Sequence, residues 1–261
     1  MNKIAVLGCG WLGFPLAKEL VKNGYIVKGS TTSKEKVDVL LTENIDAYQI
    51  DITNINPSLL ISFFKVDELI ITVPPKGNDY SKNLLKLKPF IEKSPIKRVF
   101  YTSSISVYGN VKGIITEDTI CKPITERAKQ ITLVEQQFLQ NSNFSTIILR
   151  LGGLIGNNRH PAFYVSNKVL KTSNEYINLI HLDDCIAVIK QLLQTNIKTE
   201  LFNLVAPYHP TKGTYYTQYC EKLGIPTPII NNLAVTKGKK ISSTKISTLL
   251  NYSFKNNLIH S

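Results

Sequence analysis

The sequence has few cysteines and no long apolar run, and each shortage argues against a class of protein. The four cysteines lie far apart, with no C-x-x-C spacing and no ligand-like histidine beside them, at Cys9, Cys121, Cys185 and Cys220. This pattern suggests neither a disulfide framework nor a zinc site. No apolar run approaches the ~20 residues that a membrane helix requires. We therefore expect a cytoplasmic protein without a metal site or a membrane span.

Acidic residues are also scarce, at 19 against 31 lysines and arginines, which gives a formal net charge of +12. Arginine supplies only four of those 31, and the lysines are spread from Lys3 to Lys255. They form no basic stripe with interleaved aromatic residues of the kind that nucleic-acid binders use. A solvated lysine surface is the simpler interpretation, and specific nucleic-acid binding is not expected. Such a surface still favours anionic cofactors and small anionic or polar substrates.

The 261 residues are enough for one large domain with a substantial core. Strand and helix patterns alternate through the first 150 residues, which predicts an α/β fold with a doubly wound parallel sheet, the Rossmann fold. Strands are expected at residues 3–7, 25–30, 47–50, 68–73, 98–103 and 146–150. Helices are expected at residues 14–23, 34–42, 58–64, 82–94 and 126–140.

The alternation loosens after residue 150. A short strand is expected at 176–180, a helix at 183–194, a strand at 200–205 and a helix near 214–223. The tail from Ile225 is rich in Pro, Asn, Lys and Ser, which predicts a small cap of loops and short helices. We thus expect a dinucleotide-binding domain at 1–150 and a smaller substrate-side part at 151–261, packed on it in the same structural unit.

The glycine pattern Gly8-Cys9-Gly10-Trp11-Leu12-Gly13 lies between the first expected strand and the first expected helix. In this context the three glycines allow a tight turn, close backbone approach to a pyrophosphate, and close packing of helix on strand. The helix N-terminus supplies N–H groups and a positive dipole end for the anion. The sequence therefore predicts a dinucleotide site at this turn.

Ligands of such sheets bind at the carboxyl ends of the strands, near the switch in strand order. That rule places a group of loop residues on one rim with the glycine turn. The expected cofactor-binding residues are Gly8, Gly10, Trp11, Leu12, Gly13, Thr31, Thr32, Ser33, Lys34, Asp51, Thr72, Val73, Pro74, Thr102 and Ser103.

The second strand lacks the acidic residue that usually binds the ribose 2′-hydroxyl of NAD about 20 residues after the glycines. It runs instead into Thr31, Thr32, Ser33 and Lys34. Hydroxyls and a cation suit a 2′-phosphate, so NADP is the expected cofactor, with NAD as the alternative. Ser33 also fits the cap of the next helix, with Lys34 solvated, and both roles are compatible.

A second signature follows the fifth expected strand, where residues 102–109 read T-S-S-I-S-V-Y-G. This segment resembles the T-S-S-x-x-V-Y-G segment of the extended short-chain dehydrogenases/reductases, the NAD-dependent epimerase/dehydratase family. Further matches follow in the family's order at residues 149–151, 178–184 and 202–204, so the similarity covers nearly the whole chain. The G-x-G-W-L-G start and the segment 159–161 are similar to a short bacterial branch of it.

The resemblance implies a catalytic serine, matched by Ser104, and a Tyr-x-x-x-Lys pair on one helix face. That pair is missing, because the alignment puts Arg127 at the tyrosine position and Ile131 at the lysine position. Lys129 lies about 200° around the helix from position 131, so it should face away from the substrate. Arg127 suits an anion but stays protonated, which makes it a poor general base.

Other residues are candidate substitutes for the missing acid and base. Tyr108 lies four residues after Ser104, and the family's tyrosine at this place often lines the pocket. His160 and Tyr164 lie on the loop expected to close over the nicotinamide, although a lone loop histidine is more often solvated. His181, beside Asp183, more simply orders the start of a helix. The catalytic candidates are therefore Ser104 and Tyr108.

Together the patterns predict an NAD(P)-binding, epimerase/dehydratase-like protein that acts as an atypical oxidoreductase or epimerase on a small polar substrate. The alternative is a non-catalytic NADP-binding redox sensor or regulator, which some members of this superfamily without the tyrosine resemble. The family often forms homodimers through helix contacts, and the helix expected at 126–140 is available for one.

Overall fold

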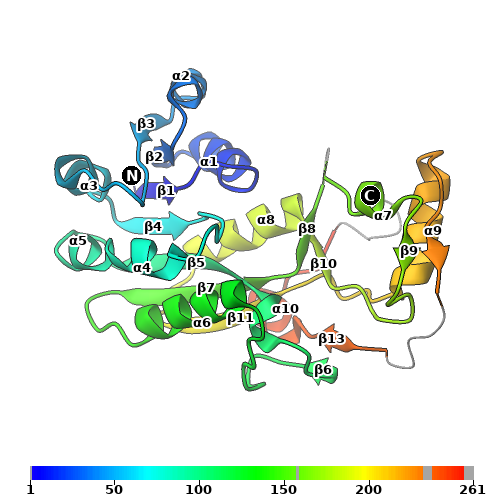
Figure 1. Cartoon of the computed structure of the whole chain (residues 1–261). Coiled ribbons are helices and arrows are strands. Elements are labelled where there is room, and N and C mark those ends of the chain that lie inside the picture. The colour runs from blue at the N-terminus through cyan, green and yellow to red at the C-terminus, as the bar shows by residue number, and fades with distance from the viewer. Residues whose placement is uncertain (1, 157–158, 232–236, 256–261) are drawn as a thin grey trace. The chain divides into compact units, whose positions relative to one another are not determined.

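The computed structural model describes residues 2–156, 159–231 and 237–255 (Figure 1). Its main feature is a seven-stranded sheet with the order β11-β7-β5-β4-β1-β2-β3. The strands are β1 (Lys3–Leu7), β2 (Ile26–Thr31), β3 (Asp46–Gln49), β4 (Glu68–Ile71), β5 (Arg98–Ser104), β7 (Ser145–Leu151) and β11 (Glu200–Leu204). The order runs outward in both directions from β1, with the switch between β1 and β4, and the four pairs that β1 to β5 form are parallel. The predicted doubly wound α/β fold is confirmed.

Helices follow most of these strands along the chain: α1 (Gly13–Lys22), α2 (Lys34–Thr42), α3 (Pro57–Phe63), α4 (Tyr80–Leu85), α5 (Lys88–Glu92), α6 (Glu126–Leu139) and α8 (Leu182–Leu193). The single helix expected at 82–94 is wrong, because two short helices occur there. Pro89 lies in the first turn of α5 and has no N–H to donate, so one hydrogen bond of a continuous helix is missing there. Helices α4 and α6 lie side by side (Figure 1).

The chain divides into two compact units, and each combines separate segments. The first unit holds residues up to 107 together with 123–149 and 189–201. Of the described residues, the second holds 108–122, 150–156, 159–188, 202–231 and 237–255. One change of unit falls between residues 149 and 150, while 108–122 belong to the second unit and 189–201 to the first. The division into a dinucleotide-binding domain and a substrate-side part stays a prediction.

The second unit contains short elements besides the longer helix α9 (Lys212–Lys222). It also contains η1 (Ile105–Tyr108, shared with the first unit), β6 (Gly113–Ile115), β8 (Gly153–Ile155), α7 (Ala162–Val165), β9 (Val169–Leu170), β10 (Leu179–His181), β12 (Ile229–Ile230), β13 (Lys239–Ile241) and α10 (Thr244–Leu250). The elements β7, α8 and β11 are likewise shared between the two units. Parallel pairs join β8 to β10, β9 to β12 and β6 to β13. A buried cluster that includes Ile155, Ile177 and Tyr215 forms part of its core.

Candidate functional site

The glycine turn after β1 needs glycine at its first and third positions for reasons visible in its geometry. Gly8 has φ +98°, a left-handed conformation that side chains rarely adopt, and its missing Cβ would lie 3.0 Å from Val73 Cγ2. At Gly13 a Cβ would lie 2.3 Å from the Gly8 carbonyl oxygen and 2.5 Å from Thr72 Oγ1. These two glycines therefore form the tight turn and the close helix–strand contact that the sequence predicted.

Gly10 differs from both, because a Cβ there would meet only the Gly8 carbonyl oxygen, at 3.9 Å. The turn thus leaves open space at its second glycine, where the fold itself does not require one. Helix α1 begins just beyond, with no capping side chain at Leu12 and no acidic residue in its first turn. Uncapped N–H groups beside open backbone form a site for an anion, so these residues fit the pyrophosphate of a dinucleotide.

Two residues that sequence reasoning did not select hold this turn in place. Ser30 at the end of β2 accepts a hydrogen bond from Gly8 N through its Oγ at 2.9 Å, and its carbonyl accepts one from Cys9 N at 2.7 Å. Cys9 packs beside Gly29, and burial raises the pKa of its thiol to about 12. Cys9 is therefore a neutral packing residue, and the contact of Ser30 with Gly8 depends on the pairing of β1 with β2, which the sequence alone does not show.

The end of β2, the loop after it and the first turn of α2 carry hydroxyls, a cation and one carboxylate. Thr31 is buried and its Oγ1 accepts a hydrogen bond from Ser33 N at 3.2 Å, while Thr32 and Lys34 are exposed. Ser33 caps α2 by accepting from Lys36 N at 3.4 Å, and its hydroxyl donates to Glu35 Oε2 at 2.5 Å. The cap expected for Ser33 is confirmed, which leaves Thr32 and Lys34 as the groups open to a ligand.

Four further residues that the sequence predicted to bind the cofactor follow β3 and β4. Asp51, two residues beyond β3, is exposed and accepts hydrogen bonds from Thr53 N and Oγ1, both at 2.8 Å. Thr72 donates through Oγ1 to the Gly8 carbonyl at 2.7 Å, and Val73 contacts Gly8. Pro74 is exposed just beyond them. Thr72 and Val73 thus support the glycine turn from the neighbouring strand.

Three hydroxyl residues end β5. Thr102 Oγ1 donates to the Ile71 carbonyl at 3.0 Å, and the buried Ser103 donates to the carboxylate of Glu135 on α6. Ser104 is half-buried, and its Oγ accepts a hydrogen bond from Ser106 N at 3.2 Å, which leaves its O–H available to donate. Thr102 and Ser103 therefore join structural elements, whereas Ser104 is the hydroxyl suited to contact a substrate.

Helix α6 holds the positions where the resembling family has tyrosine and lysine. Ile131 is 1% exposed and belongs to the core. Lys129 is exposed and lies 3.9 Å from Glu126, as expected for a residue on the outer face. Arg127 is exposed. Burial raises the pKa of Tyr80 to about 12, and the charge of Arg127 opposes that rise. On this helix no group replaces the Tyr-x-x-x-Lys pair as an acid and base.

In the second unit, Tyr108 is fully buried and its hydroxyl is engaged on both sides. It donates to Asn203 Oδ1 at 2.7 Å and accepts from Arg150 Nη1 at 2.9 Å. The Arg150 guanidinium also lies over the Tyr108 ring, 4.8 Å from its centre. Burial, the largest effect, raises the pKa of this phenol. Such an environment suits a residue that fixes the surrounding strands, and its catalytic role stays a prediction.

The histidines considered from sequence are likewise held by neighbours. His160 accepts from Ala162 N at 3.1 Å through Nδ1, so Nε2 donates to the Tyr215 hydroxyl at 2.9 Å. Its ring stacks on Tyr219 at 3.7 Å, and burial lowers its pKa to about 4. His181 accepts from Asp183 N at 3.2 Å, in keeping with the expected ordering role. Tyr164 is 71% exposed.

Comparison with known proteins shows to which family the chain belongs. A family model described as the NAD binding domain of 6-phosphogluconate dehydrogenase matches residues 3–110. Protein YeeZ of Escherichia coli (strain K12) is 33% identical over 267 residues, which cover 98% of the chain and 96% of YeeZ. The chain belongs to the YeeZ family.

The fold of this YeeZ family member is similar to the folds of solved structures. UDP-glucuronic acid 4-epimerase from Bacillus cereus, in complex with NAD, has a TM-score of 0.83 at 21% identity and covers 98% of the chain and 93% of the epimerase. A short-chain dehydrogenase/reductase superfamily protein from Agrobacterium tumefaciens with bound NAD has a TM-score of 0.82 at 14% identity and covers 98% and 94%. At these identities the likeness concerns the fold. The fold is therefore similar to that of this epimerase and of this short-chain dehydrogenase/reductase superfamily protein, which is the fold that the sequence motifs predicted.

Within residues 2–156, 159–231 and 237–255, no helix has the length and apolar character needed to cross a membrane. Over those same ranges, no three His, Cys, Asp or Glu side chains gather as potential metal ligands.

Proposed function

We propose that the chain binds NADP(H) at the glycine turn and acts as an atypical oxidoreductase or epimerase-like enzyme on a small polar substrate. The open space at Gly10, beside the uncapped start of α1, carries this proposal. A bound nicotinamide cofactor supplies the hydride-transfer chemistry. The chain would bind its pyrophosphate at Gly8 to Gly13 and its adenosine ribose near Thr31 to Lys34.

The preference for NADP rests on charge at the end of β2. The solved relatives named above carry NAD, and NAD remains the alternative. Here, however, no carboxylate ends β2, whereas Thr32 and Lys34 are exposed there. The carboxylate of Glu35 is nearby, but it accepts a hydrogen bond from Ser33. A 2′-phosphate would gain the Lys34 cation and hydroxyl donors, and Glu35 would weaken that gain.

Lys34→Met should weaken NADPH binding about fivefold and leave NADH binding unchanged, because only NADPH carries the 2′-phosphate and an exposed ion pair contributes about 1 kcal/mol or less. Trp11, the single tryptophan, lies in the glycine turn, so its fluorescence reports binding by energy transfer to the reduced nicotinamide. Lys22→Met, which removes an exposed charge from the other end of α1, is the matched control. Equal loss for both cofactors would contradict the assignment of Lys34.

The proposed chemistry at the substrate depends on Ser104. Its O–H would donate a hydrogen bond to the reacting oxygen, since Ser106 N already occupies one acceptor position of Oγ. A pocket tyrosine or an ordered water would exchange the proton, because α6 offers neither the tyrosine nor the lysine. The basic surface favours an anionic substrate.

Ser104→Ala should lower kcat for a carbonyl substrate by roughly a hundredfold or more, the usual effect of removing one donor to a reacting oxygen. The dissociation constant for NADPH should stay within about twofold, because Ser104 is not expected to bind the cofactor. NADPH oxidation with a panel of small carbonyl compounds measures the first quantity and titration calorimetry the second. Ser106→Ala is the control, since it removes an exposed neighbouring hydroxyl.

Tyr108→Phe, assayed in the same panel, separates the two roles open to this phenol. A loss of kcat at unchanged melting temperature would support the catalytic prediction. A lower melting temperature with unchanged kcat would show that the bonds to Asn203 and Arg150 are structural.

The non-catalytic NADP sensor remains the second candidate, favoured by the replacement of the family's tyrosine and lysine with Arg127 and the buried Ile131. The two proposals differ in one result. Tight NADPH binding with turnover on any substrate of the panel supports the enzyme, and tight binding without turnover on any of them supports the sensor.

A further inference from the structure

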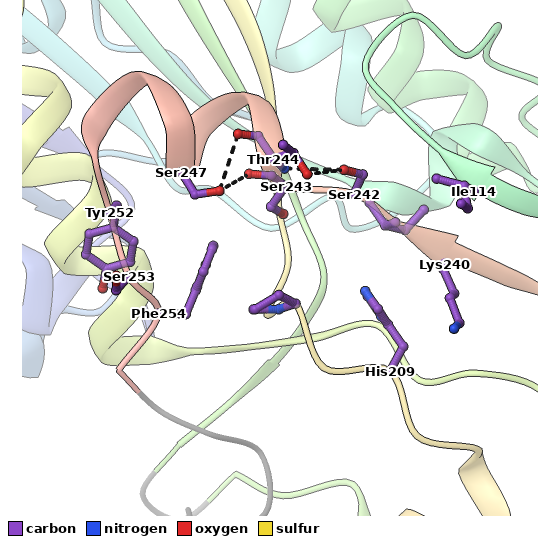
Figure 2. A pocket seen from close by; sticks show the side chains of 12 residues that line it. Ile114, His209, Lys240, Ser242, Ser243, Thr244, Ser247, Tyr252, Ser253 and Phe254 are labelled. Atoms are coloured by element: carbon purple, nitrogen blue, oxygen red, sulfur yellow. Dashed lines mark hydrogen bonds between the residues drawn. The ribbon is translucent and has the colours of Figure 1, made fainter.

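A cavity lies wholly within the second unit and involves none of the residues of the glycine turn. It has a volume of about 530 Å³ and is formed by the loop after β11, by β6 and β13, and by α10 with the residues that follow it. Figure 2 shows serine and threonine side chains along one side, Lys240 and His209 on another, and Tyr252 and Phe254 opposite.

Two sides of the cavity offer a cation and a hydroxyl donor. Lys240 Nζ lies over the Tyr176 ring, 4.3 Å from its centre, and among the described residues it has no carboxylate within ion-pair distance. Ser242 Oγ and Thr244 Oγ1 are 2.9 Å apart and share one hydrogen bond. Since each hydroxyl has one proton, that bond uses one and leaves the other to donate. These groups together suit an oxyanion.

His209 adds an acceptor with a defined tautomer. Its Nδ1 lies 3.1 Å from the Ile177 carbonyl oxygen, which can only accept, so Nδ1 carries the proton. Burial, with the nearby Lys240 charge opposing protonation, lowers the pKa of this imidazole and keeps it neutral. Nε2 is therefore an acceptor, which suits a hydroxyl or N–H of a ligand.

The remaining walls are apolar. Phe254 packs edge-on against Tyr252, with ring centres 5.3 Å apart, and Pro207 also lines the cavity. Ile114 on β6 is 76% exposed, so its side chain presents an accessible apolar surface to the cavity. An apolar body placed against these residues would remove that surface from water.

We propose that this cavity is a binding site for a small organic acid with an apolar body. The acid group would lie at Lys240 with the Ser242 and Thr244 hydroxyls, and the body would lie against Ile114 and Phe254. This inference goes beyond the proposed function and does not depend on it, since every residue involved belongs to the second unit.

The experiment titrates the full chain, labelled with ¹⁵N, with four probes: benzoate, phenyl phosphate, benzyl alcohol and inorganic phosphate. Benzoate or phenyl phosphate should shift the backbone amides of residues 240–247 in a saturable manner. Benzyl alcohol lacks the anion and inorganic phosphate lacks the apolar body, so each should bind at least about tenfold more weakly. The tighter of the first two probes identifies the acid group as a carboxylate or a phosphate.

Two pairs of variants test the residues, and each has a control matched in chemistry. Lys240→Met should weaken the better probe about fivefold or more, whereas Lys222→Met should not, although Lys222 also lies over a tyrosine ring in this unit. Ile114→Ser should weaken it about threefold or more. Ile120→Ser should not, since Ile120 is equally exposed at 76% but does not line the cavity.

Three results would overturn the proposal. The first is the absence of saturable shifts from both acids at concentrations on the order of 10 mM. The second is equal weakening by the matched variants, which would indicate binding to general surface charge. The third is a set of shifts confined to the glycine turn. The variants replace solvent-accessible side chains, and unchanged melting curves will establish that each is folded.

Discussion

Gly10→Val should weaken NADPH and NADH binding by at least about a hundredfold, which corresponds to about 2.7 kcal/mol, while the protein stays folded. A Cβ at this position meets only one backbone oxygen, at 3.9 Å, so the fold has room for a side chain. The second glycine of such a turn exists to let the backbone approach the pyrophosphate, and a valine side chain would fill that approach. Trp11 fluorescence and titration calorimetry measure the affinity, and thermal unfolding measures the stability.

Gly13→Val provides the contrasting variant within the same turn. There a Cβ would lie 2.3 Å from the Gly8 carbonyl oxygen and 2.5 Å from Thr72 Oγ1, so substitution must displace the backbone. We expect it to lower the melting temperature as well as the affinity. If Gly10→Val retained tight cofactor binding, the pyrophosphate would have to bind elsewhere, and the proposed function would lose its main support.

The sequence predicted the features that depend on local geometry. The glycine spacing indicated where a tight turn and a close helix contact were required, and Gly8 has the positive φ of the turn whereas Gly13 makes the close contact. Apolar runs located the strands, because a strand in a parallel sheet is buried on both faces. Ser33 could be recognised as a cap because capping involves only the next three residues.

Features that depend on distant pairing were not predictable in this way. Ser30 supports Gly8 because β1 and β2 are neighbours, which only the strand order reveals. The burial of Tyr108 depends on Arg150 and Asn203, which are 42 and 95 residues further along the chain. The V-Y-G motif therefore singled out Tyr108 as a candidate, but it did not indicate that the Tyr108 hydroxyl forms hydrogen bonds with both Asn203 and Arg150.

Arg98→Met should lower the free energy of unfolding by about 3 kcal/mol or more, the usual cost of removing one partner from a buried ion pair. Nη2 of Arg98 donates to Glu68 Oε1 at 2.7 Å and to the Leu193 carbonyl at 2.9 Å. Nη1 donates to the carbonyls of Leu192, Thr195 and Ile197, at 3.2, 2.7 and 3.3 Å. The guanidinium thus binds the last carbonyl groups of α8 and the segment beyond it, where intrahelical partners end. Methionine fills similar volume but removes all of these donors, although the Leu192 carbonyl keeps hydrogen bonds from Thr195 N and Oγ1.

The pH dependence of this variant distinguishes the ion pair from the carbonyl contacts. Burial already raises the pKa of Glu68, and Arg98 opposes that rise, so removing the arginine raises the pKa further above its unfolded value. A folded state that binds the extra proton loses stability as pH increases, so the defect of Arg98→Met should be larger at pH 8 than at pH 5. Adding Glu68→Gln should remove this pH dependence and restore only part of the stability, because the carbonyl groups still lack the arginine donors. Chemical denaturation at both pH values measures the effect, with the exposed Lys97→Met as control, and a defect independent of pH would show that the carbonyl contacts alone account for the role of Arg98.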